Sequence, residues 1–429
     1  MSAAEILRPL VGATLGDDAT VRVRCWDGSG YGPPDAPVQV VFRTRRALRR
    51  LLWAPNELGF ARAYVSGDVD LEGDVFTGLA ELDRLADPAR GPGIVVDGRT
   101  RAAVVGAALR LGVVGPPPRP PAEEARLAGR RHTRRRDSRA VTHHYDVGND
   151  FYELVLGPSL TYSCAYFADG PAGPPALEAA QLAKCDLVAR KLGLARGTRV
   201  LDVGCGWGTF AIHAASTYGA RVVGVTLSPA QAASARRRAR EAGVGDRVEI
   251  RVQDYRDVTD GPFDAIASIG MAEHVGLRAL SDYGRHLHAL LRPRGRLLNH
   301  AIARRPGPPD EPSRTSFIER YVFPDGELEP LGTMVAALED AGLEVRDVES
   351  LREHYALTLR AWVANLEGRW DEAVALTGPG RARVWRLYMA GSALAFEANR
   401  LGVNQVLAVR PDIRGLSGVP RTRGALLGG

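Results

Sequence analysis

The feature that most restricts the fold of this chain is a glycine-rich turn between a strand and a helix. The run Leu201-Asp-Val-Gly-Cys-Gly-Trp-Gly208 completes an apolar strand pattern that starts at Thr198, and it precedes a helical pattern that reaches about Tyr218. Glycines at such a turn let bare backbone approach a ligand, because side chains there would keep the ligand away. The turn therefore predicts a ligand site at the carboxyl end of a strand.

Strand and helix patterns alternate after this turn. Ser228 is expected to cap a helix that has Pro229 at its first position and Gly243 at its end. The order predicts an α/β fold with a doubly wound, mostly parallel sheet, in which ligands bind at the carboxyl ends of the strands. The further strands expected from the apolar runs are 221–226, 248–252, 263–268, 295–300 and 343–351.

The first part of the chain predicts a smaller α+β domain without an evident reaction centre. The run Gly115-Pro-Pro-Pro-Arg-Pro-Pro121 is a stiff, extended spacer. We therefore expect an N-terminal domain over 1–114, a linker rich in proline and arginine over 115–139, and a second domain over 140–429. The elements expected in the N-terminal domain are strands over 21–24, 38–42 and 93–96 and helices over 45–53 and 75–87.

The charge of the chain is compatible with two kinds of partner. Only Lys184 and Lys191 are lysines, so 56 − 2 = 54 of the basic residues are arginine, and the net charge is +6. Arginine binds phosphate oxygens bidentately, so nucleic acid and an anionic membrane surface both fit. Seven arginines fall between Arg126 and Arg139, where a solvated linker is an equal alternative to such a contact.

Other features predict an ordinary intracellular globular protein. The chain is 45% apolar, and no stretch has the roughly 18 uncharged apolar residues that a membrane span needs. The N-terminus has no signal-peptide pattern, so we expect a cytoplasmic location. The spacing of the cysteines fits neither a zinc site nor a redox pair, which predicts reduced thiols and no metal. These cysteines are Cys25, Cys164, Cys185 and Cys205.

Two cofactors fit the glycine turn. A dinucleotide-binding turn usually reads G-x-G-x-x-G and has an acidic residue near the end of the second strand. Here Gly208 comes one position early, and the second strand ends at Thr226 without a carboxylate. Asp202 before the turn and Asp254 after the third strand favour S-adenosylmethionine, with Asp254 accepting a hydrogen bond from the adenine amino group. NAD is the lesser alternative.

Five motifs that follow the proline-rich spacer carry a more specific signal. They are His143-His-Tyr-Asp-Val-Gly-Asn-Asp-Phe-Tyr152, Leu160-Thr-Tyr-Ser-Cys-Ala-Tyr-Phe167, Leu201 to Gly208, Thr226-Leu-Ser228 with Gln231, and Gly270-Met-Ala-Glu-His-Val-Gly276. In this order they resemble the cyclopropane-fatty-acyl-phospholipid synthase family, which includes mycolic acid cyclopropane synthases and fatty-acid C-methyltransferases that make 10-methylene or 10-methyl lipids. The resemblance covers about residues 140–410, and residues 61–73 are similar to the N-terminal domain of that family.

The resemblance implies a Rossmann-like class I methyltransferase fold and a pocket for S-adenosylmethionine. Core packing is the alternative role for Tyr162 and Tyr255. Asp202, Gly208 and Leu227 belong to the same turns and are included in the predicted site. The other residues implied to line the pocket are Tyr162, Ser163, Gly204, Gly206, Thr226, Gln231, Asp254 and Tyr255.

The reaction implied by the resemblance methylates the double bond of an unsaturated acyl chain in a phospholipid. Attack of the alkene on the sulfonium methyl leaves a carbocation, so the pocket must exclude water. A base must then remove a proton. Its removal from the new methyl group closes a cyclopropane ring, and its removal after a hydride shift gives a methylene branch.

In this family the base resembles a bound bicarbonate or carbonate. A neutral imidazole and a phenol can donate to such an anion, and Glu273 can accept the bicarbonate hydroxyl proton. His300 could instead be a core histidine, and Cys164 a small buried hydrophobe. The matching positions are Glu273, His300, Ile302, Tyr355 and Cys164.

Two positions depart from the pattern of the family. Ala272 stands where many relatives carry a bulky residue, and Asp325 stands where many have a small one. We hypothesise that the smaller Ala272 changes the room around the cation and favours the methylene product.

Two other functions compete with lipid methylation. A nucleic-acid methyltransferase, which the arginines would suit, commonly has Asn-Pro-Pro-Tyr or a catalytic cysteine motif where this chain has Gly270-Met-Ala-Glu-His. The other rival is an inactive, membrane-binding relative. We expect an unsaturated phospholipid at the inner face of the membrane as partner and no nucleic acid. A homo-oligomer and a reductase partner stay open.

Overall fold

The computed structural model describes residues 1–8, 21–86, 98–125, 147–168, 176–307 and 316–427. The chain forms two compact units. The first comprises residues 1–126, 311–322 and 370–394, and the second comprises residues 127–310, 323–369 and 395–429. The strand predicted over 93–96, the seven arginines from Arg126 to Arg139, and His143 and His144 lie outside the described residues.

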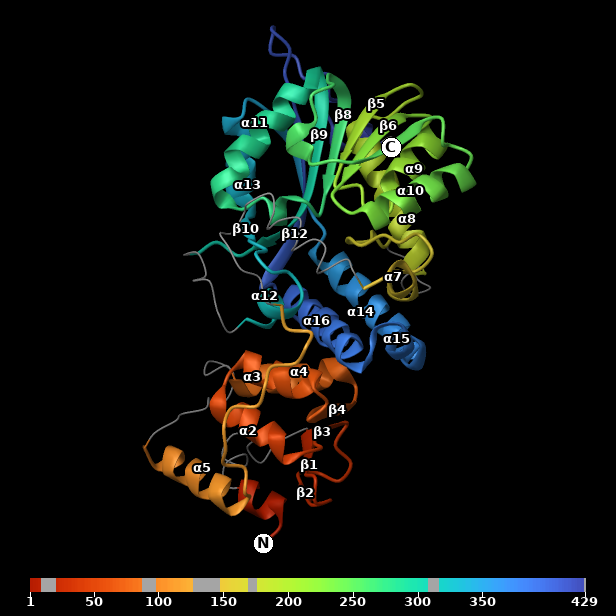
Figure 1. The fold of residues 1–429 in the computed structure, drawn as a ribbon. Helices are drawn as coiled ribbons and strands as arrows, with labels where there is room; N and C mark the ends of the chain where they lie inside the picture. The colour runs from red at the N-terminus through yellow and green to blue at the C-terminus, as the bar shows by residue number, and fades with distance from the viewer. Residues whose placement is uncertain (9–20, 87–97, 126–146, 169–175, 308–315, 428–429) are drawn as a thin grey trace. The chain divides into compact units, whose positions relative to one another are not determined.

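The second unit is built on an eight-stranded sheet (Figure 1) with the order β11-β12-β9-β8-β5-β6-β7, and β10 pairs with β9. The strands from β7 to β9 are parallel, while β12 is antiparallel to both β9 and β11. The chain order reverses direction at β5, where doubly wound sheets bind ligands. The strands are β5 (Arg199–Val203), β6 (Arg221–Thr226), β7 (Val248–Val252), β8 (Phe263–Ile269), β9 (Leu291–Arg304), β10 (Glu329–Pro330), β11 (Glu344–Ser350) and β12 (Leu401–Val409).

Helices cover both faces of this sheet, as Figure 1 shows. The central strands are therefore buried on both sides, which explains their continuous apolar runs. Two apolar clusters fill the space between sheet and helices, one on each face. The helices are α8 (Leu177–Leu192), α9 (Thr209–Tyr218) and α10 (Pro229–Glu241) on one face, and α11 (Leu280–Leu290) and α13 (Leu331–Asp340) on the other.

The predicted α/β fold is confirmed, with two strands missed, the two-residue β10 and the longer β12. The six expected strands appear as β5, β6, β7, β8, β9 and β11, and Ser228 caps α10 by accepting from the backbone N–H of Gln231 (3.3 Å). β12 was not predicted. Its sequence is a short apolar run interrupted by Asn404 and Gln405, and such a run cannot be assigned from periodicity alone.

Two further helices lie at the end of the sheet where the parallel strands finish. These are α7 (Asn149–Leu156) and α14 (Arg352–Gly368). They pack against each other, and the side-chain amide of Asn365 donates to the carbonyl of Val155 (2.9 Å). The backbone N–H of Leu351, just before α14, donates to the carbonyl of Val403 on β12 (2.8 Å). α14 is thus fixed to the sheet beside its carboxyl edge.

The first unit is the smaller α+β unit that the sequence predicts. Its sheet has the order β2-β1-β3-β4. The strands predicted over 21–24 and 38–42 and the helix over 45–53 have the expected bounds. Its elements include β1 (Val21–Arg24), β2 (Gly30–Tyr31), β3 (Val38–Phe42), β4 (Val69–Gly73), α2 (Arg45–Trp53), α3 (Glu57–Val65), α4 (Val75–Ala86) and α5 (Gly98–Arg110).

Two segments from the second half of the chain complete this first unit. They contain α12 (Phe317–Tyr321), α15 (Trp370–Thr377) and most of α16 (Pro379–Glu397). Arg383 on α16 forms an ion pair with Asp70 on β4 (2.9 Å). The unit is therefore assembled from three separate pieces of chain. A domain boundary at the proline-rich spacer leaves out the second and third pieces. Across the described ranges, no helix combines the length and apolar character needed to cross a membrane.

Candidate active site

The glycine turn after β5 forms one wall of a cavity of about 550 Å³. Gly204 and Gly206 both line it, with φ angles of 73° and 54°, in the left-handed region that strains other residues. A Cβ on Gly206 would meet no atom within 4 Å, so it would project into open space. Gly208 has a different role, because its Cβ would lie 3.0 Å from the Cβ of Ala235 on α10. It permits close packing of two helices.

Buried polar groups line the same cavity. Asp202 on β5 is buried, and its Oδ2 has no hydrogen-bond partner among the described residues. Burial raises the pKa of Asp202 to about 7, while the charge of Lys184 opposes that shift. The buried Lys184 donates from Nζ to the Oγ of Ser163 (2.9 Å). Gln231 accepts at Oε1 from the hydroxyl of Thr226 (2.9 Å), so Thr226 positions a lining residue.

A row of aromatic rings extends from the glycine turn to α14. Trp207 lies 4.7 Å from Tyr152 between ring centroids, and Tyr152 lies 5.7 Å from Tyr162. Tyr162 continues to Trp362 at 5.5 Å, and Trp362 to Tyr355 at 6.0 Å. The predicted cofactor residue Tyr162 and the predicted catalytic residue Tyr355 are therefore joined through the ring of Trp362.

Five residues predicted for the cofactor site lie outside the described lining of this cavity. They are Gly208, Thr226, Leu227, Asp254 and Tyr255. Asp254 accepts from the guanidinium of Arg256 (2.6 Å) and from the backbone N–H of the same residue (3.0 Å). The ring of Tyr255 packs edge-on against Tyr283, with centroids 5.7 Å apart. Their contact with a cofactor stays a prediction.

Glu273 lies in the short 3-10 turn η2 (Ala272–His274) that follows β8. Its Oε1 accepts from the backbone N–H of Ile302 on β9 (2.7 Å). Its Oε2 is buried and has no partner among the described residues. Burial raises the pKa of Glu273 to about 7, and the hydrogen bond from Ile302 opposes that shift. One buried oxygen of this carboxyl group is therefore available to accept a hydrogen bond from a ligand.

His300 lies two residues before Ile302 on β9 and is buried. Burial, reinforced by the charges of Lys184 and Lys191, lowers its pKa to about 3, so the imidazole is neutral near pH 7. Gln405 pairs with His300 in the sheet register, and its Nε2 lies 3.4 Å from the Nδ1 of His300. An imidazole that accepts at Nδ1 carries its proton on Nε2 and can donate from there.

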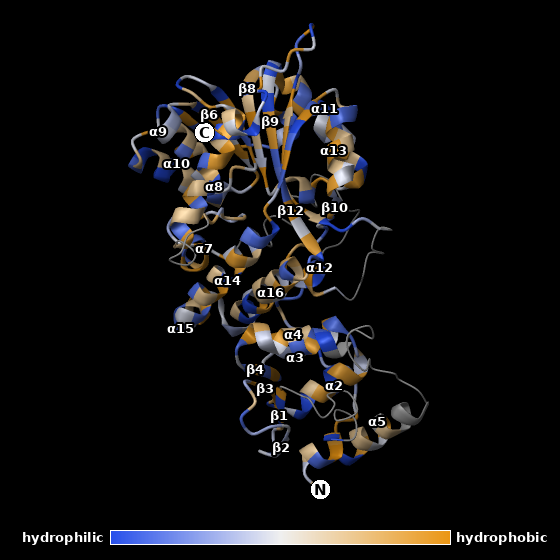
Figure 2. Ribbon diagram, turned by 180° about the vertical axis from the view of Figure 1, so that it is seen from behind, coloured by the Kyte–Doolittle hydropathy of each residue, from blue (hydrophilic) through white to orange (hydrophobic). Residues whose placement is uncertain are grey.

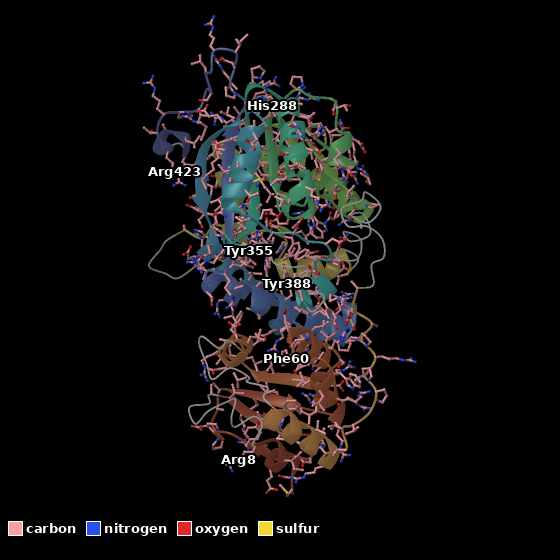
Figure 3. All side chains as sticks on the ribbon, turned by 90° about the vertical axis from the view of Figure 1, so that its left-hand side faces the viewer. Arg8, Phe60, His288, Tyr355, Tyr388 and Arg423 are labelled. Carbon is pink, nitrogen blue, oxygen red and sulfur yellow. The ribbon has the colours of Figure 1, made fainter. Side chains whose placement is uncertain are left out.

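Cys164 and Tyr355 meet at one backbone carbonyl. The Sγ of Cys164 lies 3.6 Å from the carbonyl oxygen of Leu351, which also accepts from the backbone N–H of Tyr355 (3.0 Å). Burial raises the pKa of the Cys164 thiol, so this group is a neutral thiol and a poor nucleophile. Figure 3 shows Tyr355 and His288 at opposite ends of the second unit, with His288 beside the start of β9.

These contacts connect the predicted catalytic residues. The backbone of Ile302 contacts Glu273 directly, and His300 lies two residues before Ile302 on β9. Leu351 joins Cys164 and the start of α14 to Val403, which pairs with Ile302. A separate cavity of about 410 Å³ on the α11 and α13 side also touches Glu273. Glu273 and Ile302 are thus in direct contact, while Cys164 and Tyr355 are linked to β9 through Leu351 and β12.

Three residues of the site were not predicted from the sequence: Lys184, Gln405 and Trp362. Lys184 had a usable signal, because it is one of only two lysines in the chain and is buried in the cavity wall. Gln405 had none, since its strand was not predicted. Trp362 lies inside an ordinary helix pattern, where its ring contacts cannot be read from spacing. All four cysteines are buried and free.

Comparison with known proteins gives consistent matches. A family model described as mycolic acid cyclopropane synthetase matches residues 132–406. A probable fatty acid methyltransferase of Mycobacterium tuberculosis is 42% identical over 433 residues, covering 98% of this chain and 97% of that protein. A probable fatty acid methyltransferase of Pseudomonas putida is 38% identical over 406 residues, covering 94% and 95%. A crystal structure of the mycolic acid cyclopropane synthase CmaA1 complexed with SAH and CTAB has a TM-score of 0.58 and 33% identity, covering 63% of this chain and 97% of that chain.

Proposed function

This chain belongs to the mycolic acid cyclopropane synthetase family, and from that premise we propose that it uses S-adenosylmethionine to methylate a carbon–carbon double bond in an unsaturated fatty acyl chain of a phospholipid. The observation that carries the proposal is the unpartnered, buried Oε2 of Glu273 beside the carboxyl end of β9. A lipid methyltransferase acting on an alkene needs a base at such a place, whereas transfer to an existing hydroxyl or amine does not need a buried anion site.

The glycine-turn cavity fits S-adenosylmethionine by its shape and its polar groups. Gly206 leaves open space against bare backbone. The buried Oδ2 of Asp202 is left to accept from a donor of the cofactor. When bound, the cofactor supplies an electrophilic methyl group on sulfur. Asp254 is our candidate for the adenine amino group, which would have to share its carboxylate with Arg256.

The residues predicted to act with Glu273 have the chemistry to hold a small oxyanion, for which bicarbonate is our candidate. The neutral imidazole of His300 and the phenol of Tyr355 are donors. The Oε2 of Glu273 can accept the hydroxyl proton of bicarbonate. Bound there, this anion supplies the base that a methylated alkene requires. Cys164, held as a thiol at the carbonyl of Leu351, packs beside this set without acting as a nucleophile.

The aromatic row fits a cation on the acyl chain. The faces of Tyr162, Trp362 and Tyr355 can stabilise positive charge and exclude water. Ala272 packs in an apolar cluster with Leu280 and Met334. We therefore infer that it affects the product through the position of Glu273. Cyclopropane and methylene-branched products both follow from this chemistry, and the enzyme would act from the membrane surface as a peripheral protein.

Expression in a bacterial host that lacks this activity tests the proposal. We expect the extracted phospholipids to contain acyl chains with one added methylene equivalent, identified by mass spectrometry and assigned by NMR as cyclopropane or methylene branch. A host expressing Glu273→Gln should lack the product. Methyl label from the cofactor in nucleic acid but not in oleoyl phospholipid would contradict the proposal, and so would unchanged lipid methylation in the Glu273→Gln host.

A further inference from the structure

The first unit exposes large apolar side chains on two elements far apart in sequence. Trp53 ends α2 and is 59% exposed, while Val105 and Leu109 on α5 are 58% and 64% exposed. Val114, just after α5, is 62% exposed. Val105 and Leu109 are four residues apart and so share one side of α5. Ala107, Ala108 and Leu111 on the opposite side are buried.

The end of α2 and the segment after α5 lie side by side. The indole N–H of Trp53 donates to the carbonyl of Gly115 (3.0 Å), the residue that follows Val114. A Cβ on Gly115 would lie 2.7 Å from the Nη1 of Arg49, and one on Gly112 would lie 3.7 Å from the Nη1 of Arg45. The exposed apolar groups of the two elements therefore belong to one surface. Figure 2 colours parts of both α2 and α5 as hydrophobic.

The stretches of sequence that carry these apolar groups also contain arginines and no acidic residues. Residues 43–55 contain five arginines and residues 98–121 contain four, and neither stretch contains an aspartate or glutamate. Arg43 is held by Asp70 and Glu72, and Arg46 and Arg50 are held by Asp68. Arg45 and Arg110 are exposed and form no ion pair with any residue that the structure describes. The surface therefore presents positive charge next to apolar side chains.

We infer that this surface docks on an anionic phospholipid bilayer. We define the docking patch as Trp53, Val105, Leu109, Val114, Arg45 and Arg110. A tryptophan with its N–H satisfied, exposed aliphatic side chains and exposed arginines are the groups that suit the boundary between acyl chains and headgroups. A second copy fits less well, because a twofold contact through this patch would place arginines of one copy near those of the other. The inference rests on the proposed function, because the proposed substrate is a membrane acyl chain and none of the described helices could cross a membrane.

Vesicle binding by the intact protein tests the docking patch. Cosedimentation should be strong with vesicles that contain phosphatidylglycerol and weak with vesicles of phosphatidylcholine alone. Each exposed arginine near an anionic surface contributes about fivefold to the binding constant. We therefore expect the double variant Arg45→Glu, Arg110→Glu to bind at least tenfold more weakly, and the double variant Trp53→Ser, Leu109→Ser to lose binding as well.

Matched controls change the same residue types on helices that carry no residue of the patch. The double variant Arg237→Glu, Arg285→Glu alters exposed arginines on α10 and α11, and Leu376→Ser alters an exposed leucine on α15. Both controls should bind vesicles as the unaltered protein does. Circular dichroism melts identify a variant that fails to fold. If Trp53→Ser perturbs α2, the arginine double variant still tests the inference. Arg45 and Arg110 are exposed, so their replacement should not disturb folding.

Methylation assays separate this inference from the proposed function. Patch variants should methylate a detergent-dispersed oleoyl lipid at the unaltered rate and fail only on vesicles. Active variants that bind vesicles normally would overturn the docking inference and leave the proposed function intact. If the patch variants lose vesicle binding but the unaltered protein methylates no acyl chain in either assay, the docking inference stands and the proposed function fails. A patch variant that loses self-association in sedimentation velocity, with vesicle binding unchanged, would make the surface a contact between copies and would also overturn the inference.

Discussion

At the scale of single residues, the carboxyl group of Glu273 differs from most buried acids because only one of its oxygens is satisfied. Oε1 accepts from Ile302, and Oε2 has no partner in the described parts of the chain. A buried carboxyl without a second partner is unfavourable unless a ligand completes it. In our account that ligand is the anion that serves as the base.

Replacing Glu273 with glutamine should remove the acceptor and keep the shape of the side chain. We expect kcat for lipid methylation to fall by about 10²- to 10⁴-fold, the usual contribution of a positioned acid or base. The affinity for S-adenosylmethionine, measured by calorimetry, should be unchanged. Glu339→Gln changes an exposed glutamate on α13 and should keep full activity. Equal losses in both variants would contradict the assignment.

The titration of Glu273 predicts the pH dependence. Burial raises its pKa to about 7, so the group is protonated below that pH and cannot accept a proton. At saturating cofactor, kcat/KM for the lipid should therefore rise as pH increases through about 7. The residual activity of Glu273→Gln should lack this rise. A flat profile for the unaltered enzyme from pH 5.5 to 8.5, about 1.5 units on either side of that pKa, would argue against a titrating carboxyl.

At the scale of elements, the glycine turn combines two separate requirements. Gly206 leaves room in the cavity, whereas Gly208 lets α9 approach α10. Both have positive φ angles, so alanine at either position carries the same kind of backbone strain, about 1–2 kcal/mol. The two positions therefore form a matched pair that separates ligand binding from packing.

Gly206→Ala should weaken S-adenosylmethionine binding at least tenfold, because its methyl group would occupy cavity space. Gly208→Ala should leave the affinity within a few-fold and lower the free energy of unfolding by an additional ~1–3 kcal/mol, because its methyl group would press on Ala235. Calorimetric titration and denaturant unfolding measure the two effects. If Gly208→Ala weakened cofactor binding and Gly206→Ala instead showed the additional loss of stability, the roles given to the two glycines would be wrong.

Much of the second unit could be predicted because its strands are buried on both faces and bounded by clear turns. The positions of Glu273 and His300 follow from the ends of β8 and β9. Gln405 could not be found, because β12 joins the sheet only through tertiary pairing with β9 and β11. The aromatic row was equally hidden, since its rings come from α7, the segment before α8, the turn after β5, and α14. Spacing within one element does not reveal contacts among several.

At the scale of the whole molecule, the chain leaves the second unit twice to complete the first. Residues 311–322 and 370–394 carry α12, α15 and most of α16 into the unit formed mainly by the N-terminal part. Proline-rich spacers mark where a chain changes direction or extends, but they give no information about later segments that return. The interleaved order implies that the first unit cannot be complete until α16 has been synthesised.

The ion pair between Arg383 and Asp70 should stabilise this return. Both side chains are largely buried, and Arg383 also lies over the ring of Tyr64 at 5.2 Å. Arg383→Ala should lower the free energy of unfolding of the first unit by ~1–3 kcal/mol, because Asp70 loses its buried partner and keeps only the more exposed Arg43. Arg360→Ala removes an exposed pair with Glu397 and should cost under about 1 kcal/mol. Equal effects in denaturant unfolding would contradict a special role for Arg383.

The most direct test of alkene methylation uses S-adenosylmethionine with a fully deuterated methyl group, the purified protein and oleoyl phospholipid. Methyl transfer to a double bond followed by proton loss, by either the cyclopropane or the methylene route, removes one deuteron. Our account predicts a product that keeps two of the three deuterons, with both acyl carbons of the former double bond altered. A product that keeps all three deuterons on an oxygen, a nitrogen or a nucleic-acid base would contradict it.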